Sequence, residues 1–251
     1  MRAWLNLRYT NDSRARMFER GLKRVGFKPE HGIPANPGKK DIFITWNRIG
    51  AGNTTAKLFE SSGLPVLVVE NASWGNRFGG ENWYHIARNY HNTVGMFDFV
   101  DCARWDDLNQ PLLDWRRGGE TVILPQRGIG SDPVRMPKWF LKKATDEHGG
   151  RIRRHPGRNE RIALEDDLAN CGMVITWGSG AAIKAIAMGI PCLSYMPDWI
   201  GHQYNTDKSR LEMFRRLAWA QWRHQEIKSG LAFDCLLNNA RDESKRKLAG
   251  S

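Results

Sequence analysis

Long apolar runs are missing from this chain. No window of about eighteen apolar residues occurs, which is the length that a membrane-spanning helix needs. The first residues, MRAWLNLRYTNDSRAR, do not form the apolar core of a signal peptide, because charged residues interrupt them. We therefore expect no membrane span and a cytoplasmic location.

Cysteine is scarce, and the four residues are scattered as Cys102, Cys171, Cys192 and Cys235. They are too far apart for a CxxC metal pattern or for a small disulfide framework. Cys171 and Cys192 lie beside segments that we predict to be buried strands, where a thiol packs as a small hydrophobic group. The sequence therefore predicts no structural metal.

Acidic residues are fewer than basic ones: the chain has 27 Asp and Glu and 38 Lys and Arg, which gives a formal net charge of +11. The basic residues recur along both halves of the chain, and a denser run occurs only near the C-terminus. Spread positive charge concentrates polyanions, so the expected partner is nucleic acid, a nucleotide or an acidic polysaccharide. The alternative is that the charge serves solubility alone.

The first half alternates strand and helix patterns. Apolar runs predict strands at 3–7, 41–46 and 65–69, helical periodicity predicts helices at 13–24 and 53–62, and 27–40 reads as a surface loop. This order predicts a doubly wound parallel domain over residues 1–117, with 104–119 as a linker.

A second domain is expected over residues 118–207. It begins with a strand at 121–125, has a helix at 137–148, and contains the stretch from Arg151 to Tyr195 around which it is organised. Beyond it, apolar spacing predicts one long helix over 209–229 and a final helix over 232–237. We expect residues 208–251 to pack across both domains.

The stretch from Arg151 to Tyr195 has a definite pattern. A basic turn with His155 and Arg158 is followed by a short acidic helix at 165–170, a strand at 173–176, the turn Gly178-Ser179-Gly180, a helix and a further strand. A glycine turn that opens a helix can present backbone N–H groups to a phosphate or a sugar. The alternative is a tight turn without a ligand.

Better-known motifs do not fit this turn. The third glycine of the dinucleotide fingerprint is missing. Lys184 has no glycine directly before it and no serine or threonine directly after it, so the turn is not a P-loop. Trp177 occupies the place of the first glycine of a nucleophile elbow, so Ser179 does not fit that motif. Because parallel strands end at one sheet edge, the basic turn and the glycine turn are expected to meet there.

This order of segments resembles the donor-nucleotide half of GT-B glycosyltransferases, and in particular the capsule Kdo-transferase-like proteins and bacteriophage glycosyltransferases. The resemblance implies two Rossmann-like, doubly wound parallel-sheet domains facing across a cleft, with C-terminal helices crossing back. It also implies a nucleotide-sugar donor, for which we favour a UDP-sugar. Lys184 stands near the place where many members have a ribose-binding Glu, which leaves the nucleotide open.

Three groups of site residues are predicted. The donor-binding group consists of Arg127, Gly128, Gly130, His155, Arg158, Gly178, Ser179, Gly180 and Lys184. The candidates for the catalytic base are Glu70, which follows a buried strand, His91 and Asp98. The acceptor-binding group consists of Asn47, Arg48, Asn71, Trp74 and Arg77. No acidic pair stands at a strand end to hold a metal, so Arg, His and the helix dipole are expected to balance the leaving-group charge.

The predicted function is transfer of a sugar from a nucleotide-sugar to a hydroxyl group. The positive charge favours a polyanionic acceptor, and hydroxymethylated bases of phage DNA fit it best; the protein would then act in the host cytoplasm. One alternative is transfer to a capsule-like glycan. Another is a protein that binds nucleotides or nucleic acid without turnover. The oligomeric state stays open.

Overall fold

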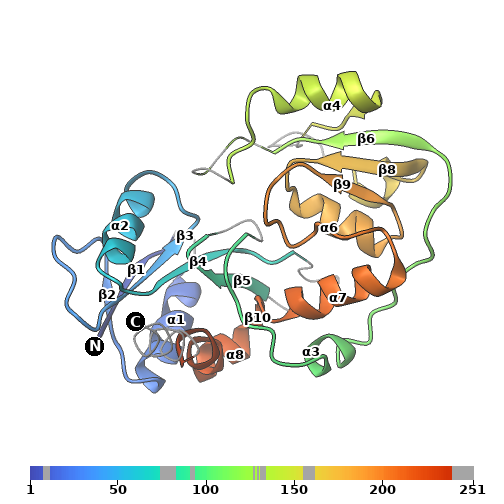
Figure 1. Ribbon diagram of the computed structural model, residues 1–251. Helices are drawn as coiled ribbons and strands as arrows, with labels where there is room; N and C mark the ends of the chain where they lie inside the picture. The colour runs from blue at the N-terminus through green and yellow to red at the C-terminus, as the bar shows by residue number, and fades with distance from the viewer. Residues whose placement is uncertain are drawn as a thin grey trace, which may run out of the picture. The chain divides into compact units, whose positions relative to one another are not determined.

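The computed structural model describes residues 1–7, 12–73, 83–90, 94–126, 128, 130, 134–154 and 162–238, with the backbone alone at 12 and 13. The chain divides into two compact units (Figure 1). The first contains residues 1–91, 95–100 and 218–251, and the second contains 92–94 and 101–217. Each unit has a β-sheet of its own.

The sheet of the first unit is mixed. Its strands are β1 (Arg2–Asn6), β2 (Lys28–His31), β3 (Ile42–Trp46), β4 (Val66–Asn71), β5 (Trp83–Arg88) and β10 (Gln221–Arg223). They lie in the order β10-β5-β4-β3-β1-β2. The strands β1, β3 and β4 are parallel, as predicted, and β2 also runs parallel to β1. In contrast, β5 runs antiparallel to both β4 and β10.

Helices cover both faces of this sheet. Alternate residues of a strand point to opposite faces, and in β4 Leu67 and Val69 belong to a different core cluster from Val66 and Val68. The first cluster packs under α1 (Asp12–Arg24), α8 (His224–Ser229) and a helical segment at 231–238. The second packs under α2 (Gly50–Ser61). Helices on both faces are therefore present, as predicted for this part of the chain, but the sheet is mixed rather than fully parallel.

The strand β2 lies inside the segment that was predicted to be a surface loop. Its sequence, Lys-Pro-Glu-His, has no apolar residue besides proline, and neither its first nor its last residue is buried. Proline cannot donate a ladder hydrogen bond and is tolerated at a sheet edge, which is the position of β2. An edge strand with a polar sequence was therefore not recognised from the pattern of apolar residues.

The long helix predicted over 209–229 is wrong. The chain forms α7 (Asp207–Ala218), then the short strand β10, then α8. Residues 221–223 pair antiparallel with 83–85 of β5, and Gln221 and Trp222 are buried there. Pairing with a distant strand thus overrides a helical spacing of apolar residues.

The second unit has a fully parallel sheet in the order β7-β6-β8-β9. Its strands are β6 (Glu120–Leu124), β7 (Arg151–Ile152), β8 (Cys171–Thr176) and β9 (Cys192–Ser194). Its helices, besides α7, are α3 (Ala103–Asp106), α4 (Phe140–His148), α5 (Leu164–Asp167) and α6 (Gly180–Ala187). No helix among the described residues is long and apolar enough to cross a membrane.

The segment predicted as a linker is instead packed within the second unit. The ring of Trp105 stacks on Phe214 of α7 at 4.7 Å between centroids. Arg210, also on α7, donates to the carbonyl oxygen of Leu113 at 2.6 Å. These contacts hold residues 101–117 and α7 together, which explains why both lie in the second unit.

Candidate functional site

Both sheets share one arrangement of strands. In the first unit β1 has β2 on one side and β3 on the other, and in the second unit β6 lies in the same way between β7 and β8. At such a point the order in which the strands are added to the sheet reverses, and open α/β sheets bind ligands there, at the carboxyl ends of the strands. A ligand site is therefore expected near the ends of β3 and β8.

The same three residues stand at the ends of the two strands. Ile44-Thr45-Trp46 ends β3, whereas Ile175 and Thr176 end β8 and Trp177 follows directly. The Thr176 hydroxyl donates to the carbonyl oxygen of Leu124 at 3.0 Å and accepts from the N–H of Ser179 at 2.9 Å. Each threonine is fully buried. The hydroxyl of Thr176 thereby ties the end of β6 to the turn that opens α6.

The turn Gly178-Ser179-Gly180 is built to leave the start of α6 open. Ser179 caps the helix, because its side chain accepts from the N–H of Ala181 at 3.3 Å. Gly180 is exposed, and a β-carbon placed on it would meet nothing within 4 Å. Gly178 is enclosed instead: a β-carbon there would lie 2.2 Å from Cε of Met196. The predicted helix start therefore has an accessible N-terminus.

The loop after β6 faces the same turn. The side-chain amide of Gln126 donates to the carbonyl oxygen of Gly178 at 2.6 Å. Gly128 and Gly130 follow with φ angles of 66° and 115°, in the region that favours glycine. Lys184 lies one turn into α6 and is partly exposed. The structure thus brings Gln126, which the sequence analysis did not name, to the glycine turn.

Three of the predicted donor-binding residues, Arg127, His155 and Arg158, lie outside the described residues. The same holds for His91, predicted as a catalytic candidate, and for Trp74 and Arg77, predicted to bind the acceptor. Their predicted roles stay predictions.

In the first unit, Glu70 lies beside a buried histidine. Glu70 on β4 pairs across the sheet with His85 on β5, and His85 pairs with Gln221 on β10. The Nε2 atom of His85 lies 3.9 Å from Oε1 of Glu70, and its Nδ1 lies 2.7 Å from Nε2 of Gln221. His85 and Gln221 are completely buried, whereas the side chain of Glu70 is 18% exposed. A carboxylate at the strand ends is therefore accessible on one side and backed by an imidazole.

Two predicted acceptor-binding residues lie near Glu70. The N–H of Asn47 donates to the carbonyl oxygen of Val69 at 2.9 Å, which places Asn47 next to the end of β4. Asn47 has a φ angle of 51°, in the left-handed region that asparagine tolerates. Asn71 follows Glu70 directly and is exposed. The structure therefore gathers Asn47, Glu70 and Asn71 at one edge.

Arg48 has a different environment from the one expected of an acceptor-binding residue. It is only 2% exposed, and its guanidinium donates to both carboxylate oxygens of Glu60, at 2.5 and 2.6 Å. It also donates to Asn53 at 3.0 Å and to the carbonyl oxygen of Asn89 at 2.6 Å. These contacts anchor α2 internally, so we leave Arg48 out of the proposed site.

Asp98 is also paired. Its carboxylate lies 3.4 Å from Nη2 of Arg88, which is itself buried. This ion pair occupies the carboxylate of Asp98, whereas Glu70 lies at the strand ends near Asn47 and Asn71. Among the predicted catalytic residues that the structure describes, we therefore place Glu70 rather than Asp98 in the proposed site.

Comparison with known proteins identifies the fold. No protein-family model matches the chain, and a search of curated proteins finds no match. Two solved structures from Thermosulfurimonas dismutans are similar. The KpsC β-Kdo 2,4 transferase is 14% identical over 89% of this chain and 92% of its own, with a TM-score of 0.58. The KpsC β-Kdo 2,7 transferase is 11% identical over 93% of this chain and 99% of its own, with a TM-score of 0.51. This chain shares the fold of these transferase structures.

The described residues contain no group of three or more His, Cys, Asp or Glu side chains that could hold a metal ion. The two buried thiols of the second sheet are instead suited to packing: burial raises the pKa of Cys192 well above its usual value, and that of Cys171 is also raised by burial.

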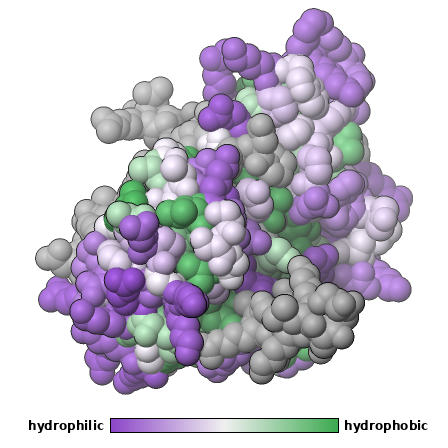
Figure 2. Space-filling view, turned by 60° about the vertical axis from the view of Figure 1, so that its left-hand side comes forward, coloured by the Kyte–Doolittle hydropathy of each residue, from purple (hydrophilic) through white to green (hydrophobic). Residues whose placement is uncertain are grey.

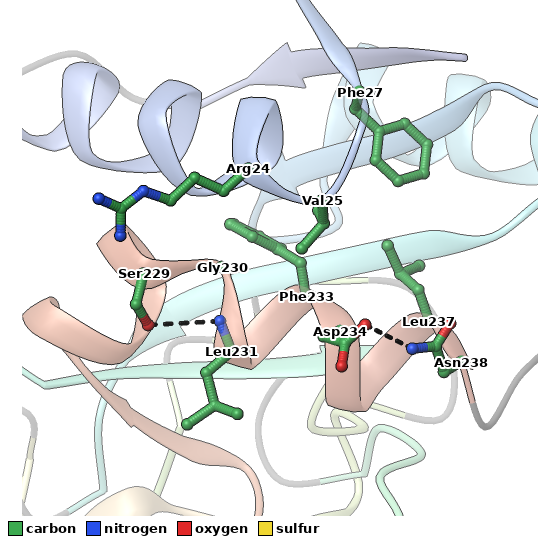
Figure 3. Close-up of a pocket in the computed structure, with 10 residues that line it drawn as sticks. All are labelled: Arg24, Val25, Phe27, Ser229, Gly230, Leu231, Phe233, Asp234, Leu237 and Asn238. Carbon is green, nitrogen blue, oxygen red and sulfur yellow. Dashed lines mark hydrogen bonds between the residues drawn. The ribbon is translucent and has the colours of Figure 1, made fainter.

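A pocket in the first unit lies away from the strand ends. It has a volume of about 450 Å³ and lies between the end of α1 and the 231–238 segment. Figure 3 shows Val25 and Phe233 facing each other in it. Because α1 leads directly into β2, its end lies where the parallel strands begin, at the edge opposite Glu70. This pocket is therefore separate from the candidate site.

The sequence analysis missed His85 and Gln221. His85 stands in the run Trp-Tyr-His-Ile-Ala-Arg, which was not predicted as a strand, although five of its six residues are buried. A histidine at an alternate position between apolar residues was the available signal. Its partners could not be read from the sequence, because Gln221 lies 136 residues away.

Proposed function

We propose that this protein is a glycosyltransferase that moves a sugar from a nucleotide-sugar donor to a hydroxyl acceptor. The observation that carries the proposal is the accessible N-terminus of α6, which lies where the strand order of the second sheet reverses. The chain also shares its fold with two transferases. The second unit binds the donor nucleotide, and the first unit activates the acceptor.

The donor phosphates are proposed to bind at the start of α6. Backbone N–H groups at a helix N-terminus point toward an anion, and the helix dipole favours negative charge there. Gly180 allows close approach, because no side chain covers it. Lys184, together with Arg127, His155 and Arg158, supplies positive charge for the leaving group. A UDP-sugar is the proposed donor.

Glu70 is proposed as the general base. Its carboxylate takes the proton of the acceptor hydroxyl while the acceptor oxygen forms a bond to the anomeric carbon. The bond from that carbon to the phosphate oxygen breaks, and the nucleotide leaves with the electron pair. Asn47 and Asn71 lie at the same strand ends and offer amide groups that can hold the acceptor.

The acceptor is proposed to be an acidic glycan. A net charge of +11 suits an anionic acceptor. The two transferases of the same fold are named for the transfer of Kdo and not for a nucleic acid, which favours a glycan over DNA. On the face drawn in Figure 2, hydrophilic side chains are spread widely rather than gathered in one area. DNA with hydroxymethylated bases is the second candidate, which the same positive charge favours.

The donor site is tested with Gly180→Asp. A carboxylate at the first position of a helix favours the helix, so the fold should be kept, but it repels a phosphate. We expect UDP, GDP, CMP or one of their sugar conjugates to raise the Tm of the wild-type protein, and the shift to vanish in Gly180→Asp. Gly180→Asn, which has the same shape without the charge, is the matched control and should keep most of the shift.

The outcomes separate the alternatives. If no nucleotide shifts the wild-type Tm, or if Gly180→Asp responds like Gly180→Asn, the donor site is not at this turn. If a nucleotide binds but no sugar reaches either an acidic oligosaccharide or hydroxymethylated DNA, the chain is a binding protein without turnover. If sugar is transferred to hydroxymethylated DNA but not to the oligosaccharide, the acceptor is DNA rather than an acidic glycan.

A further inference from the structure

A row of three side chains crosses the sheet of the first unit. Gln221, His85 and Glu70 occupy directly opposed positions on the neighbouring strands β10, β5 and β4. Their side chains lie on one face of the sheet, because directly paired residues of neighbouring strands point to the same side. Gln221 and His85 have no exposed surface. Two polar side chains are therefore buried behind the carboxylate that we propose as the base.

The backbone fixes the orientation of Gln221. The N–H of Ser73 donates to Oε1 of Gln221 at 2.8 Å. A backbone N–H can only donate, so the oxygen of the amide must face Ser73 and the nitrogen must face His85. That nitrogen lies 2.7 Å from Nδ1 of His85. Because an amide nitrogen can only donate, Nδ1 must be the acceptor in this hydrogen bond.

The tautomer of His85 follows. A neutral imidazole with an unprotonated Nδ1 carries its proton on Nε2. Nε2 is the atom that faces Oε1 of Glu70, at 3.9 Å. That separation exceeds a hydrogen-bond length, so the N–H directs the carboxylate through electrostatic attraction. The Phe97 ring packs against the imidazole in a T-shaped arrangement, with 6.4 Å between the two ring centroids.

We infer that His85 is a positioning residue for Glu70 and that Gln221 holds it in the Nε2–H form. The inference rests on the proposed function for its catalytic meaning, but the tautomer itself does not depend on turnover. His85 acts on the reaction through Glu70, by presenting an N–H to one carboxylate oxygen. Gln221 acts one step further away, by preventing the proton from residing on Nδ1.

The tautomer is tested directly by NMR of the ¹⁵N-labelled full chain. Long-range ¹H–¹⁵N correlations distinguish the two neutral forms of an imidazole, and the signals of His85 are assigned by their loss in His85→Gln. We expect the Nε2–H pattern for His85 in the wild-type protein. In Gln221→Glu, a carboxylate oxygen replaces the amide nitrogen and can only accept a hydrogen bond, so Nδ1 should become the donor and the pattern should change to one with a protonated Nδ1. An Nδ1–H form in the wild type would overturn the inference.

The role is tested with a matched pair of substitutions. In His85→Gln the side-chain nitrogen can reach the place of Nε2 and still donate toward Glu70, whereas in His85→Asn the amide reaches only the place of Nδ1. Both variants lose the ring that packs on Phe97. We expect kcat of sugar transfer to fall about 100-fold in His85→Asn, the size of effect that misplacing a catalytic group has, with donor KM unchanged. His85→Gln should recover most of kcat.

Equal loss of kcat in the two variants would overturn the positioning role, as would full activity in both. Amide hydrogen exchange of the first unit, measured on both variants, shows that the fold around His85 is kept, and nucleotide-induced Tm shifts show the same for the second unit. A wild-type protein that transfers no sugar would count against the proposed function, while the NMR result would still decide the tautomer.

Discussion

In both units the sequence Ile-Thr-Trp stands at the end of a buried strand, and the two units differ from the next position onward. In the first unit Asn47 follows with a left-handed backbone and leads to the buried Arg48. In the second unit Gly178 follows and leads to the capping Ser179 and the open Gly180. The same strand end therefore opens into an internally anchored helix in one unit and into an accessible helix start in the other.

This difference underlies the roles that we propose for the two units. The guanidinium of Arg48 is engaged with its neighbours beside α2, so the groups that we propose to act in the first unit lie on β4, β5 and β10 instead. In the second unit, a β-carbon placed on Gly180 would meet nothing within 4 Å among the described residues. We therefore expect the residues that follow the shared motif, rather than the motif, to decide whether a strand end can bind an anion.

The largest effect is expected at Glu70. Glu70→Gln keeps the size of the side chain but removes the base, so kcat of transfer should fall about 10²-fold to 10⁴-fold. Because we propose that the donor binds in the other unit, the nucleotide-induced Tm shift should persist. Asp98→Asn is the control, with a much smaller loss of activity. If Asp98→Asn is the more damaging, the assignment of the base is wrong.

Arg48 tests how strongly the first unit depends on its buried charge. Arg48→Met leaves Glu60 without its partner, and we expect the free energy of unfolding to fall by about 2–3 kcal/mol, below the range for fully buried pairs because Glu60 is 30% exposed. Ser179→Ala, at the equivalent helix of the second unit, removes one cap and should cost about 1 kcal/mol. Urea unfolding gives both values. If Arg48→Met lowered the free energy of unfolding less than Ser179→Ala does, the first unit would not depend on its buried charge as we expect.

The two units should respond to opposite ends of the pH scale. Asp41 in the first unit accepts from the N–H groups of Gly38 and Arg2 and pairs with the Arg2 guanidinium; these contacts outweigh its burial and lower its pKa to about 2. A lowered pKa stabilises the fold above the normal value near 3.8, and this contribution is lost as pH falls toward 2. Asp41→Asn should cost about 2 kcal/mol at pH 7 and flatten the acid limb.

In the second unit, burial and the hydrogen bond from its hydroxyl to Glu147 raise the pKa of Tyr195 to about 12. A raised pKa stabilises the fold below pH 10, and this contribution is lost as pH rises from 10 toward 12. Tyr195→Phe should flatten the alkaline limb and leave the acid limb unchanged. Hydrogen exchange, which resolves the units, is the measurement. Acid exposure that opens the second unit first would contradict this assignment.

The smallest effects are expected at Thr45 and Thr176, the threonines of the shared Ile-Thr-Trp sequence. Thr176→Val loses hydrogen bonds of 3.0 and 2.9 Å, whereas Thr45→Val loses bonds of 3.2 and 3.3 Å to Asn47 and Asn6. We expect costs of about 1.5 kcal/mol and about 1 kcal/mol, respectively. Only Thr176→Val should weaken nucleotide binding, because only Thr176 holds the N–H of Ser179. Equal weakening in both variants would argue against a donor site confined to the second unit.

Local patterns were enough to predict much of this fold. Unbroken apolar runs predicted β3, β4, β6 and β8, and glycine with a small capping residue predicted the start of α6. They also predicted Glu70 as an accessible carboxylate at the end of a strand. These features depend on residues within one turn or one strand of each other, so a short window of sequence contains the physical cause.

Tertiary structure alone decided the rest. The strands β5 and β10 form because they pair with each other, and that pairing places Gln221 behind His85 and His85 behind Glu70. The packing of Trp105 on Phe214 likewise brings an expected linker into the second unit. Strand register and long-range packing depend on residues more than a hundred positions apart, and no local periodicity records them.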